Sequence, residues 1–81
     1  MFACPCCGFL TLPTRTDWDL CPVCFWEDDP SQAADESDPA GANGLSLQDA
    51  RTNYALIGAI HESFIDKVRA PEPQEIPGAL L

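Results

Sequence analysis

Two short motifs, each with two cysteines separated by two residues, hold the side chains best suited to chemistry. Cys4 and Cys7 form the first motif, and Cys21 and Cys24 form the second, with thirteen residues between the pairs. Each loop of this kind turns two sulfur atoms toward one point, and four thiolates in a tetrahedron leave no open position on a metal ion. The spacing therefore predicts a closed structural site for one Zn²⁺, with these four cysteines as its ligands.

The same spacing also describes a rubredoxin-like iron centre, which would make the protein an electron carrier. Phe25, in place of a glycine, follows the second motif, and a long C-terminal helix has no place in so small a carrier. Zinc is therefore the preferred metal and iron the alternative. A chain of 81 residues is hard to stabilise by its core alone, so we expect the metal to hold the fold together.

Two further side chains, those of Cys6 and His61, could take part in chemistry. The sequence indicates no catalytic group beside either of them. Cys6 lies between two predicted ligands, so we expect its side chain to point outward, where a nearby metal would activate it as a thiol redox sensor. The simpler interpretation is a small residue that fits the turn. His61, the one histidine, is expected at the edge of the core. No nucleophile elbow, phosphate-binding loop or open metal site is recognised, so we do not expect an enzyme.

The charge of the chain indicates the kind of partner it would bind. The chain has four Lys and Arg residues and 13 Asp and Glu residues, which gives a formal net charge of −9. Phosphate groups repel such a chain, so nucleic-acid binding is not expected, whereas a basic protein would be attracted. Trp26 precedes Glu27, Asp28 and Asp29, which predicts an accessible aromatic anchor among acidic groups. An immunity protein or antitoxin would use such a surface to neutralise a basic toxin or nuclease.

The elements predicted to position these residues make an α+β fold in a single domain, residues 1–81. Residues 1–30 are expected to form a zinc-ribbon-like or rubredoxin-like pair of knuckles, with a short β-hairpin whose strands are "GFLTL" and "WDL". Residues 31–45 are rich in Ala, Asp, Ser and Gly and predict a loop. Residues 46–69 predict one long helix, and residues 70–81 a tail.

The predicted helix has an unusually wide apolar face. Ser46 is its expected N-cap, and Pro71 closes it. Apolar residues at spacings of three and four cover about half of its circumference, whereas a surface helix needs only about 100°. Tyr54 and Ile57 lie on this face. We expect either that the C-terminal "EIPGALL" folds back over it or that it docks a partner, including a second copy in a homodimer.

The cellular location is predicted from what precedes the first motif and from the cysteines. Three residues lead into Cys4, which leaves no room for a signal segment, and eighteen consecutive apolar residues occur nowhere. An odd number of cysteines, five, suits metal binding in a reducing compartment better than disulfides. We therefore expect a cytoplasmic protein that does not enter a membrane.

The chain resembles the bacterial cysteine-rich CPCC family over nearly its whole length. The matching stretches are "CPCCG" at 4–8, "CPVCFWEDD" at 21–29, "NGLSLQDARTNY" at 43–54 and "VRAP" at 68–71. The resemblance implies a metal-binding domain without an established activity, with Cys4, Cys7, Cys21 and Cys24 as ligands. It also implies a shared surface that includes Trp26, Glu27, Asp28, Asp29, Arg51, Asn53 and Tyr54.

Overall fold

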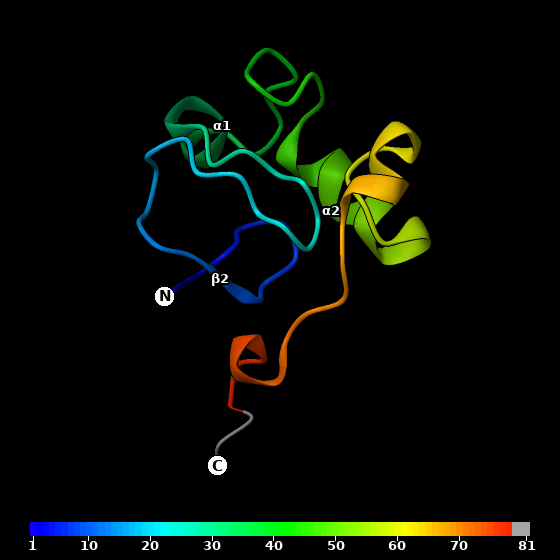
Figure 1. Cartoon of the computed structure of the whole chain (residues 1–81). Coiled ribbons are helices and arrows are strands. Elements are labelled where there is room, and N and C mark those ends of the chain that lie inside the picture. Colours follow the sequence, from blue (N-terminus) through cyan, green and yellow to red (C-terminus); the bar gives the residue numbers. More distant parts are fainter. Residues whose placement is uncertain (79–81) are drawn as a thin grey trace.

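Short elements build the α+β fold that the sequence predicts. The computed structural model describes residues 1–78 and has the elements β1 (Phe2–Ala3), β2 (Leu10–Leu12), α1 (Pro30–Ala34), α2 (Leu47–Ile57), η1 (Glu62–Lys67) and η2 (Pro73–Glu75), of which η1 and η2 are 3₁₀ helices. Figure 1 shows the N-terminal strand and loops on one side of α2, with the chain after η1 returning toward β2. Within residues 1–78, no helix has the length and apolar character needed to cross a membrane.

The first knuckle is the turn of a small antiparallel hairpin. In the hairpin Phe2 pairs with Leu12 and Ala3 pairs with Leu10, with an irregular register between the two pairs. Gly8 closes the turn with a φ of 81°, a left-handed conformation that glycine adopts without strain. A short hairpin therefore exists, as predicted, but one of its strands is β1, so the two strands flank the first knuckle instead of joining the two knuckles.

The second knuckle has a similar but smaller arrangement. Leu20 and Glu27 form an isolated antiparallel bridge, and the Phe25 N–H donates to the carbonyl of Cys21 at 2.9 Å. The predicted pairing of "WDL" with "GFLTL" is wrong. Trp18 has a φ of 64°, and a left-handed residue cannot continue an extended strand.

The single long helix predicted over residues 46–69 is also wrong, because α2 ends at Ile57. Its start agrees with the sequence: the Ser46 hydroxyl accepts the backbone N–H of Asp49 at 3.0 Å. Gly58 ends the helix with a φ of 78°, and its N–H donates to a carbonyl four residues earlier. This is the left-handed glycine stop that is common at helix C-termini.

The chain after α2 turns back into the core. Ala59 and Ile60 are buried, and the Ile60 N–H donates to the carbonyl of Cys24 at 3.0 Å. The Asn53 side chain donates to the Ile60 carbonyl at 2.8 Å, which fixes the reversal from the helix side. The prediction from helical periodicity is wrong here because apolar residues at helical spacing can equally be the buried residues of a turn.

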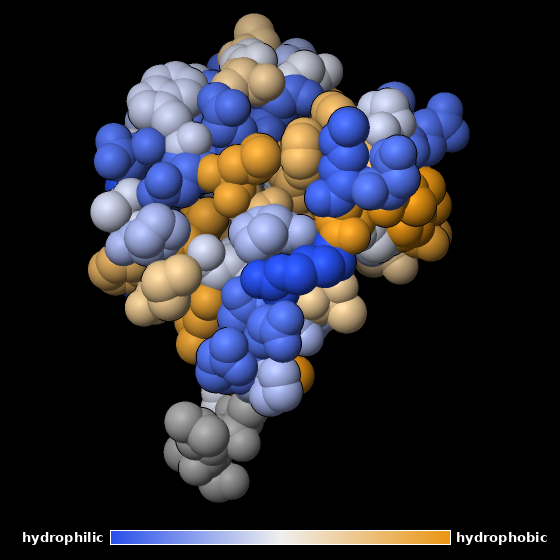
Figure 2. All heavy atoms as spheres, in the orientation of Figure 1, coloured by the Kyte–Doolittle hydropathy of each residue, from blue (hydrophilic) through white to orange (hydrophobic). Residues whose placement is uncertain are grey.

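The core is centred on the cysteines. Its buried members are Cys4, Leu12, Cys21, Val23, Cys24, Trp26, Leu47, Ala50 and Ile60. Much of the wide apolar face predicted for the helix stays outside this core, with Leu56 76% and Ile57 43% exposed. Figure 2 shows hydrophobic surface on the side where α2 ends, next to strongly hydrophilic residues.

The segment predicted as a loop, residues 31–45, is partly helical and closely held. Asp29 caps α1, its carboxylate accepting the Ser31 N–H at 2.8 Å. The Gln32 side chain is buried, and its amide donates to two loop carbonyls at 3.0 and 2.8 Å. Asn43 donates to the Gln32 carbonyl oxygen at 2.8 Å. These bonds satisfy the polar groups that the loop buries.

The last described segment returns to the knuckle region. The Arg69 N–H donates to the carbonyl of Pro22 at 3.2 Å, and η2 packs against β2. The Arg69 guanidinium holds Glu75 through two contacts of 2.8 and 2.9 Å, which lowers the pKa of this carboxyl to about 2. The predicted fold-back of "EIPGALL" onto the helix falls partly on residues 79–81, which lie outside the described residues.

Candidate metal centre

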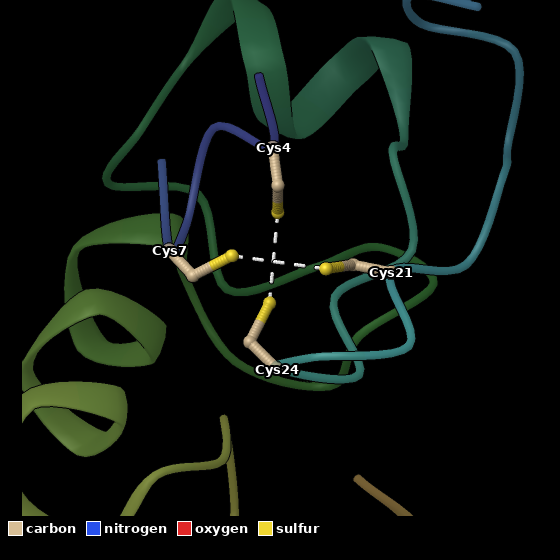
Figure 3. Close-up of side chains that lie close together, drawn as sticks. All are labelled: Cys4, Cys7, Cys21 and Cys24. Atoms are coloured by element: carbon tan, nitrogen blue, oxygen red, sulfur yellow. Dashed lines mark hydrogen bonds between the residues drawn. The ribbon is translucent and has the colours of Figure 1, made fainter. Parts of the chain in front are cut away.

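Two tight turns bring four cysteine sulfurs together. The Sγ atoms of Cys4 and Cys24 are 3.5 Å apart, those of Cys7 and Cys21 are 3.7 Å apart, and all four lie within 4.8 Å of one another. Figure 3 shows the four side chains pointing toward one centre, two from each knuckle. The structure thus brings together the residues that the motif spacing selects.

These distances suit a four-coordinate metal. A tetrahedron with Zn–S bonds of about 2.3 Å places its sulfurs about 3.8 Å apart, whereas a disulfide bond is about 2.05 Å long. All five cysteines are free thiols. The donor set fits a Zn²⁺ ion, and tetrahedral sulfur coordination fits iron as well.

The protein closes this centre on most sides. Cys4, Cys21 and Cys24 are buried, and Cys7 is half-buried. Leu12, Val23 and Trp26 are buried in the same core cluster as these sulfurs. A metal ion held by four thiolates inside this cover would have no free position for a substrate.

Without a metal, the four sulfurs hold their protons unequally. The pKa of Cys21 is lowered because Cys24, and then Cys4 and Cys7, hydrogen-bond to its thiolate. The pKa values of those three thiols are raised, in each case chiefly by the hydrogen bond to Cys21. Metal binding must displace their protons, so the apparent metal affinity should rise with pH.

The aromatic and acidic loop predicted as a partner surface is mostly buried, which corrects the expectation from sequence. Trp26 is 0%, Asp28 3% and Asp29 2% exposed, while Glu27 is half-buried. The Asp28 carboxylate accepts the Thr16 N–H at 2.6 Å, and that of Asp29 caps α1. These acids therefore hold backbone amides of neighbouring loops, and Trp26 is not accessible as an anchor.

The two helix residues predicted to contact a partner differ in exposure. Tyr54 is half-buried, with its ring edge-on to Phe9 at a centroid distance of 6.5 Å. Burial, followed by the negative charge of nearby thiolates, raises the pKa of Tyr54 to about 12. Ile57 remains exposed at the end of α2. Of this pair, Ile57 is therefore the side chain that is more accessible to a partner.

Cys6 and His61, the other two candidates for chemistry, lie outside the four-sulfur cluster. Cys6 does not point fully outward as expected: it is half-buried and packs against the core. His61 is exposed, and its Nδ1 accepts the Ser63 N–H at 3.1 Å as the cap of η1. Neither position places a general base beside a thiol.

Thr11 is the residue near the sulfurs that sequence reasoning missed. Its hydroxyl oxygen lies 3.0 Å from Cys21 Sγ, and both residues are buried. A single threonine has no motif spacing of its own. The alternation in "LTL" indicates only that its side chain faces the opposite side from Leu10 and Leu12.

One protein family matches the chain along most of its length. Its sequence model, described as Cysteine-rich CPCC, covers residues 2–75. The matched range includes both knuckles, α2 and the Arg69–Glu75 ion pair. No curated protein matches the chain.

Proposed function

The chain belongs to the cysteine-rich CPCC family, and we propose that its four clustered cysteines bind one structural Zn²⁺ that holds together a small, non-enzymatic binding module. The observation that carries this proposal is the cage of four sulfurs within 4.8 Å of one another. A zinc ion bound by four thiolates supplies folding free energy and no reactive water. The metal would therefore act on the fold and not on a substrate.

The small size of the elements supports a structural role for the metal. The two strands have 2 and 3 residues, and the longest helix has 11. Helices and hairpins of this length are marginal by themselves in water. Structural zinc contributes an apparent ~10–16 kcal/mol in small modules, which is comparable with the whole stability of an ordinary domain.

The charge of the surface supports a basic protein as the partner. The net charge is −9, and two of the four basic residues, Arg51 and Arg69, already pair with Glu36 and Glu75. The remaining acids would steer a basic protein toward the module and repel nucleic acid. An immunity or antitoxin role is the specific form of this proposal, and its support is the charge alone, since Trp26 is buried.

The state of the cysteines supports a reducing compartment, such as the cytoplasm, as the place where the module works. All five cysteines are free, although four sulfurs lie close together. An oxidising compartment would favour disulfides between such neighbours. Thiolates held by a metal suit a compartment that keeps thiols reduced.

The same cage supports one alternative, a rubredoxin-like electron carrier. Cys7 is half-buried while the other three cluster cysteines are buried. A partly exposed sulfur is the path by which an iron centre would exchange an electron with a partner. This alternative differs from the zinc proposal in its metal and not in its ligands.

The test is the metal content of the protein purified from its native cells, with co-purifying proteins identified from the same sample. One zinc per chain and a stoichiometric basic protein would support the proposal. One iron, a red colour and a reversible one-electron couple would support the carrier. A folded chain that holds neither metal would contradict both.

Charge reversal tests the partner separately from the metal. Among the three acids at positions 27–29, Glu27 has a partly exposed side chain, whereas Asp28 and Asp29 are buried. Glu27→Lys, together with reversal of the exposed pair Glu62 and Asp66, should weaken capture of a basic partner and make it less sensitive to salt. Unchanged capture by a protein with normal zinc content would contradict the electrostatic part of the proposal.

A further inference from the structure

The hydroxyl of Thr11 contacts a sulfur of the metal cage. Its oxygen lies 3.0 Å from Cys21 Sγ, with Thr11 5% exposed and Cys21 0% exposed. We propose that the Thr11 hydroxyl donates a hydrogen bond to the Cys21 thiolate and positions this ligand, so that Thr11 helps set the affinity for the metal. This inference rests on the proposed binding of a metal by the four cysteines.

The direction of the hydrogen bond follows from the chemistry of the two groups. A thiolate that coordinates a metal has no proton, so its sulfur can only accept. A threonine hydroxyl has one proton and can donate it. The backbone N–H of Thr11 is already bonded to the Phe9 carbonyl at 2.9 Å. With a metal bound, the hydroxyl is therefore the donor in the contact with Cys21.

The charge of the cage gives this hydrogen bond its importance. Four thiolates around one divalent cation leave an excess of negative charge, and three of the four ligands are buried. Buried charge is stable only where hydrogen-bond donors reach it, and such bonds are stronger than those between neutral groups. Within residues 1–78, the Thr11 hydroxyl is the side-chain donor, apart from the cysteine thiols, that lies within hydrogen-bond distance of a sulfur of the cluster. The Cys21 thiolate thus has a hydroxyl donor within hydrogen-bond distance.

The position of Thr11 in the fold makes the contact a link between the two knuckles. Thr11 is the central residue of β2, the strand that leaves the first knuckle, and Cys21 opens the second knuckle. Thr11 and Leu12 are both buried beside the cysteine cluster, and it is the Thr11 hydroxyl that reaches Cys21 Sγ. The bond therefore restrains the Cys21 side chain with a donor that comes from the other half of the cage.

Three variants separate the hydroxyl from the methyl group and from general effects of the substitution. Thr11→Val keeps the shape and removes the hydroxyl, whereas Thr11→Ser keeps the hydroxyl and removes the methyl. Thr52→Val is the matched control, because Thr52 is exposed on α2 and bonds the Gln48 carbonyl at 3.2 Å, away from the sulfurs. All three are expressed as full chains and loaded with Zn²⁺.

The first measurement is zinc affinity by competition with a chelator of known affinity, together with the rate of zinc release. Loss of a hydrogen bond to a metal ligand typically weakens binding by roughly 10–100-fold, and we expect Thr11→Val to lie near the lower end, at about tenfold. Thr11→Ser should stay within about threefold of the wild type, since its donor is retained. Thr52→Val should match the wild type.

The second measurement reports on the electron density at the Cys21 sulfur. This density would not change if Thr11 had a purely structural role. The protein is loaded with ¹¹³Cd²⁺, whose NMR resonance responds to the electron density of its thiolate ligands. Thr11→Val should move this resonance, and Thr11→Ser should leave it near the wild-type position. If Thr11→Val fails to fold, the wild-type hydroxyl proton decides: it should exchange slowly with solvent and show scalar coupling to ¹¹³Cd.

The outcomes distinguish this inference from the proposed function. A wild-type chain that binds neither Zn²⁺ nor Cd²⁺ overturns the metal site and the role of Thr11 together. A wild type that binds zinc, with Thr11→Val equal to it in affinity and in the cadmium resonance, overturns the role of Thr11 alone. Equal weakening by Thr11→Val and Thr11→Ser would mean that any change at this buried position weakens binding, so that the hydroxyl has no specific role, and it also overturns the inference. A wild-type hydroxyl proton that exchanges as fast as one in contact with solvent overturns it as well.

Discussion

The two knuckles use the same motif but have different places in the molecule. The first is the turn of a two-stranded hairpin near the N-terminus, and its Cys7 is half-buried. The second receives contacts from three distant segments, through Thr11 on β2, Ile60 after α2 and Arg69 after η1. The first knuckle accepts one bond from a distant side chain, from Arg51 on α2 to the Pro5 carbonyl at 2.9 Å, whereas the second accepts backbone N–H groups from two segments of the C-terminal part.

The difference shows how a very small chain can order a long C-terminal part. Ile60 and Arg69 donate backbone N–H groups to carbonyls at Cys24 and Pro22, so the peptide groups of the second knuckle serve as fixed acceptors. A metal bound by the four cysteines, as proposed, would hold this turn rigid and keep such acceptors in position. The stability of the C-terminal half should therefore depend on the second knuckle more than on the first.

The largest effect on the free energy of unfolding should come from replacing one proposed metal ligand at a time, first in the second knuckle and then in the first. Cys24→Ser should lower the free energy of unfolding by roughly 5 kcal/mol or more, because about a quarter of the zinc binding energy is lost and a buried hydroxyl is left unsatisfied. Cys7→Ser should lower it by roughly 3 kcal/mol, since water can take the place of the half-buried sulfur. Denaturant titration of the zinc-loaded variants measures both, and equal losses would contradict the ranking of the knuckles.

The two tryptophans give the next test, because one belongs to the second knuckle and the other does not. The backbone of Trp26 accepts the Cys21 N–H at 2.8 Å, which places this residue in the second knuckle, and its side chain is buried, so Trp26→Ala should cost about 3–5 kcal/mol in unfolding free energy through the cavity that it leaves. Trp18 is 52% exposed, and Trp18→Ala should change it by less than about 1 kcal/mol. Calorimetry on the zinc-loaded proteins makes the comparison, which fails if Trp18→Ala is the more harmful change.

The turn that returns the chain to the second knuckle should respond to a smaller change. Gly58 has a φ of 78°, and the space that an added methyl group would occupy is open, so Gly58→Ala meets backbone strain and no clash. We expect a loss of about 1–2 kcal/mol from the left-handed conformation. Relative to the wild type, the rate of hydrogen exchange should then increase more at the Ile60 amide than at the amides of the hairpin. Exchange that speeds up equally at both places would show that the second knuckle has no special role.

The ion pair that fastens the C-terminal segment should give the smallest effect, and it should depend on pH. Glu75 has a pKa lowered from 4.5 to about 2, chiefly by Arg69, so its stabilising effect is complete above about pH 4.5 and is lost as the pH falls toward 2. Glu75→Gln should release η2 from β2 at neutral pH, with Glu62→Gln as a control for the loss of one charge.

This prediction is measured by following the Arg69 side-chain NMR signals of the metal-loaded protein. Local signals are needed because unfolding of the whole protein in acid also reflects loss of the metal. A Glu75 carboxyl that titrates with its ordinary pKa, or an η2 that stays in place in Glu75→Gln, would show that the ion pair does not fasten this segment.

The cluster of four cysteines was predictable from sequence because its geometry is local. Two residues between cysteines set the turn, and the same motif occurs twice, so the grouping of Cys4, Cys7, Cys21 and Cys24 follows from spacing alone. Thr11 was not predictable, because its contact with Cys21 depends on how β2 packs beside the second knuckle. The helix start at Ser46 was likewise local and agrees with the structure.

The remaining errors come from tertiary contacts that override local patterns. Ile60 satisfies a helical period, yet its backbone is bonded to the second knuckle, and Gly58 allows the reversal. Asp28 and Asp29 look like solvated acids because carboxylates are rarely buried without partners. Here backbone N–H groups of folded loops are those partners, and they exist only once the loops are in place.

The most direct test of the metal-centred account is a zinc titration of the metal-free protein, followed by amide NMR spectra and native mass spectrometry. We predict a poorly dispersed spectrum without metal and a single folded spectrum at one equivalent of zinc, with the amides of Ile60 and Arg69 becoming protected at the same point as the cysteines. A well-dispersed spectrum that is already complete without metal would contradict the account.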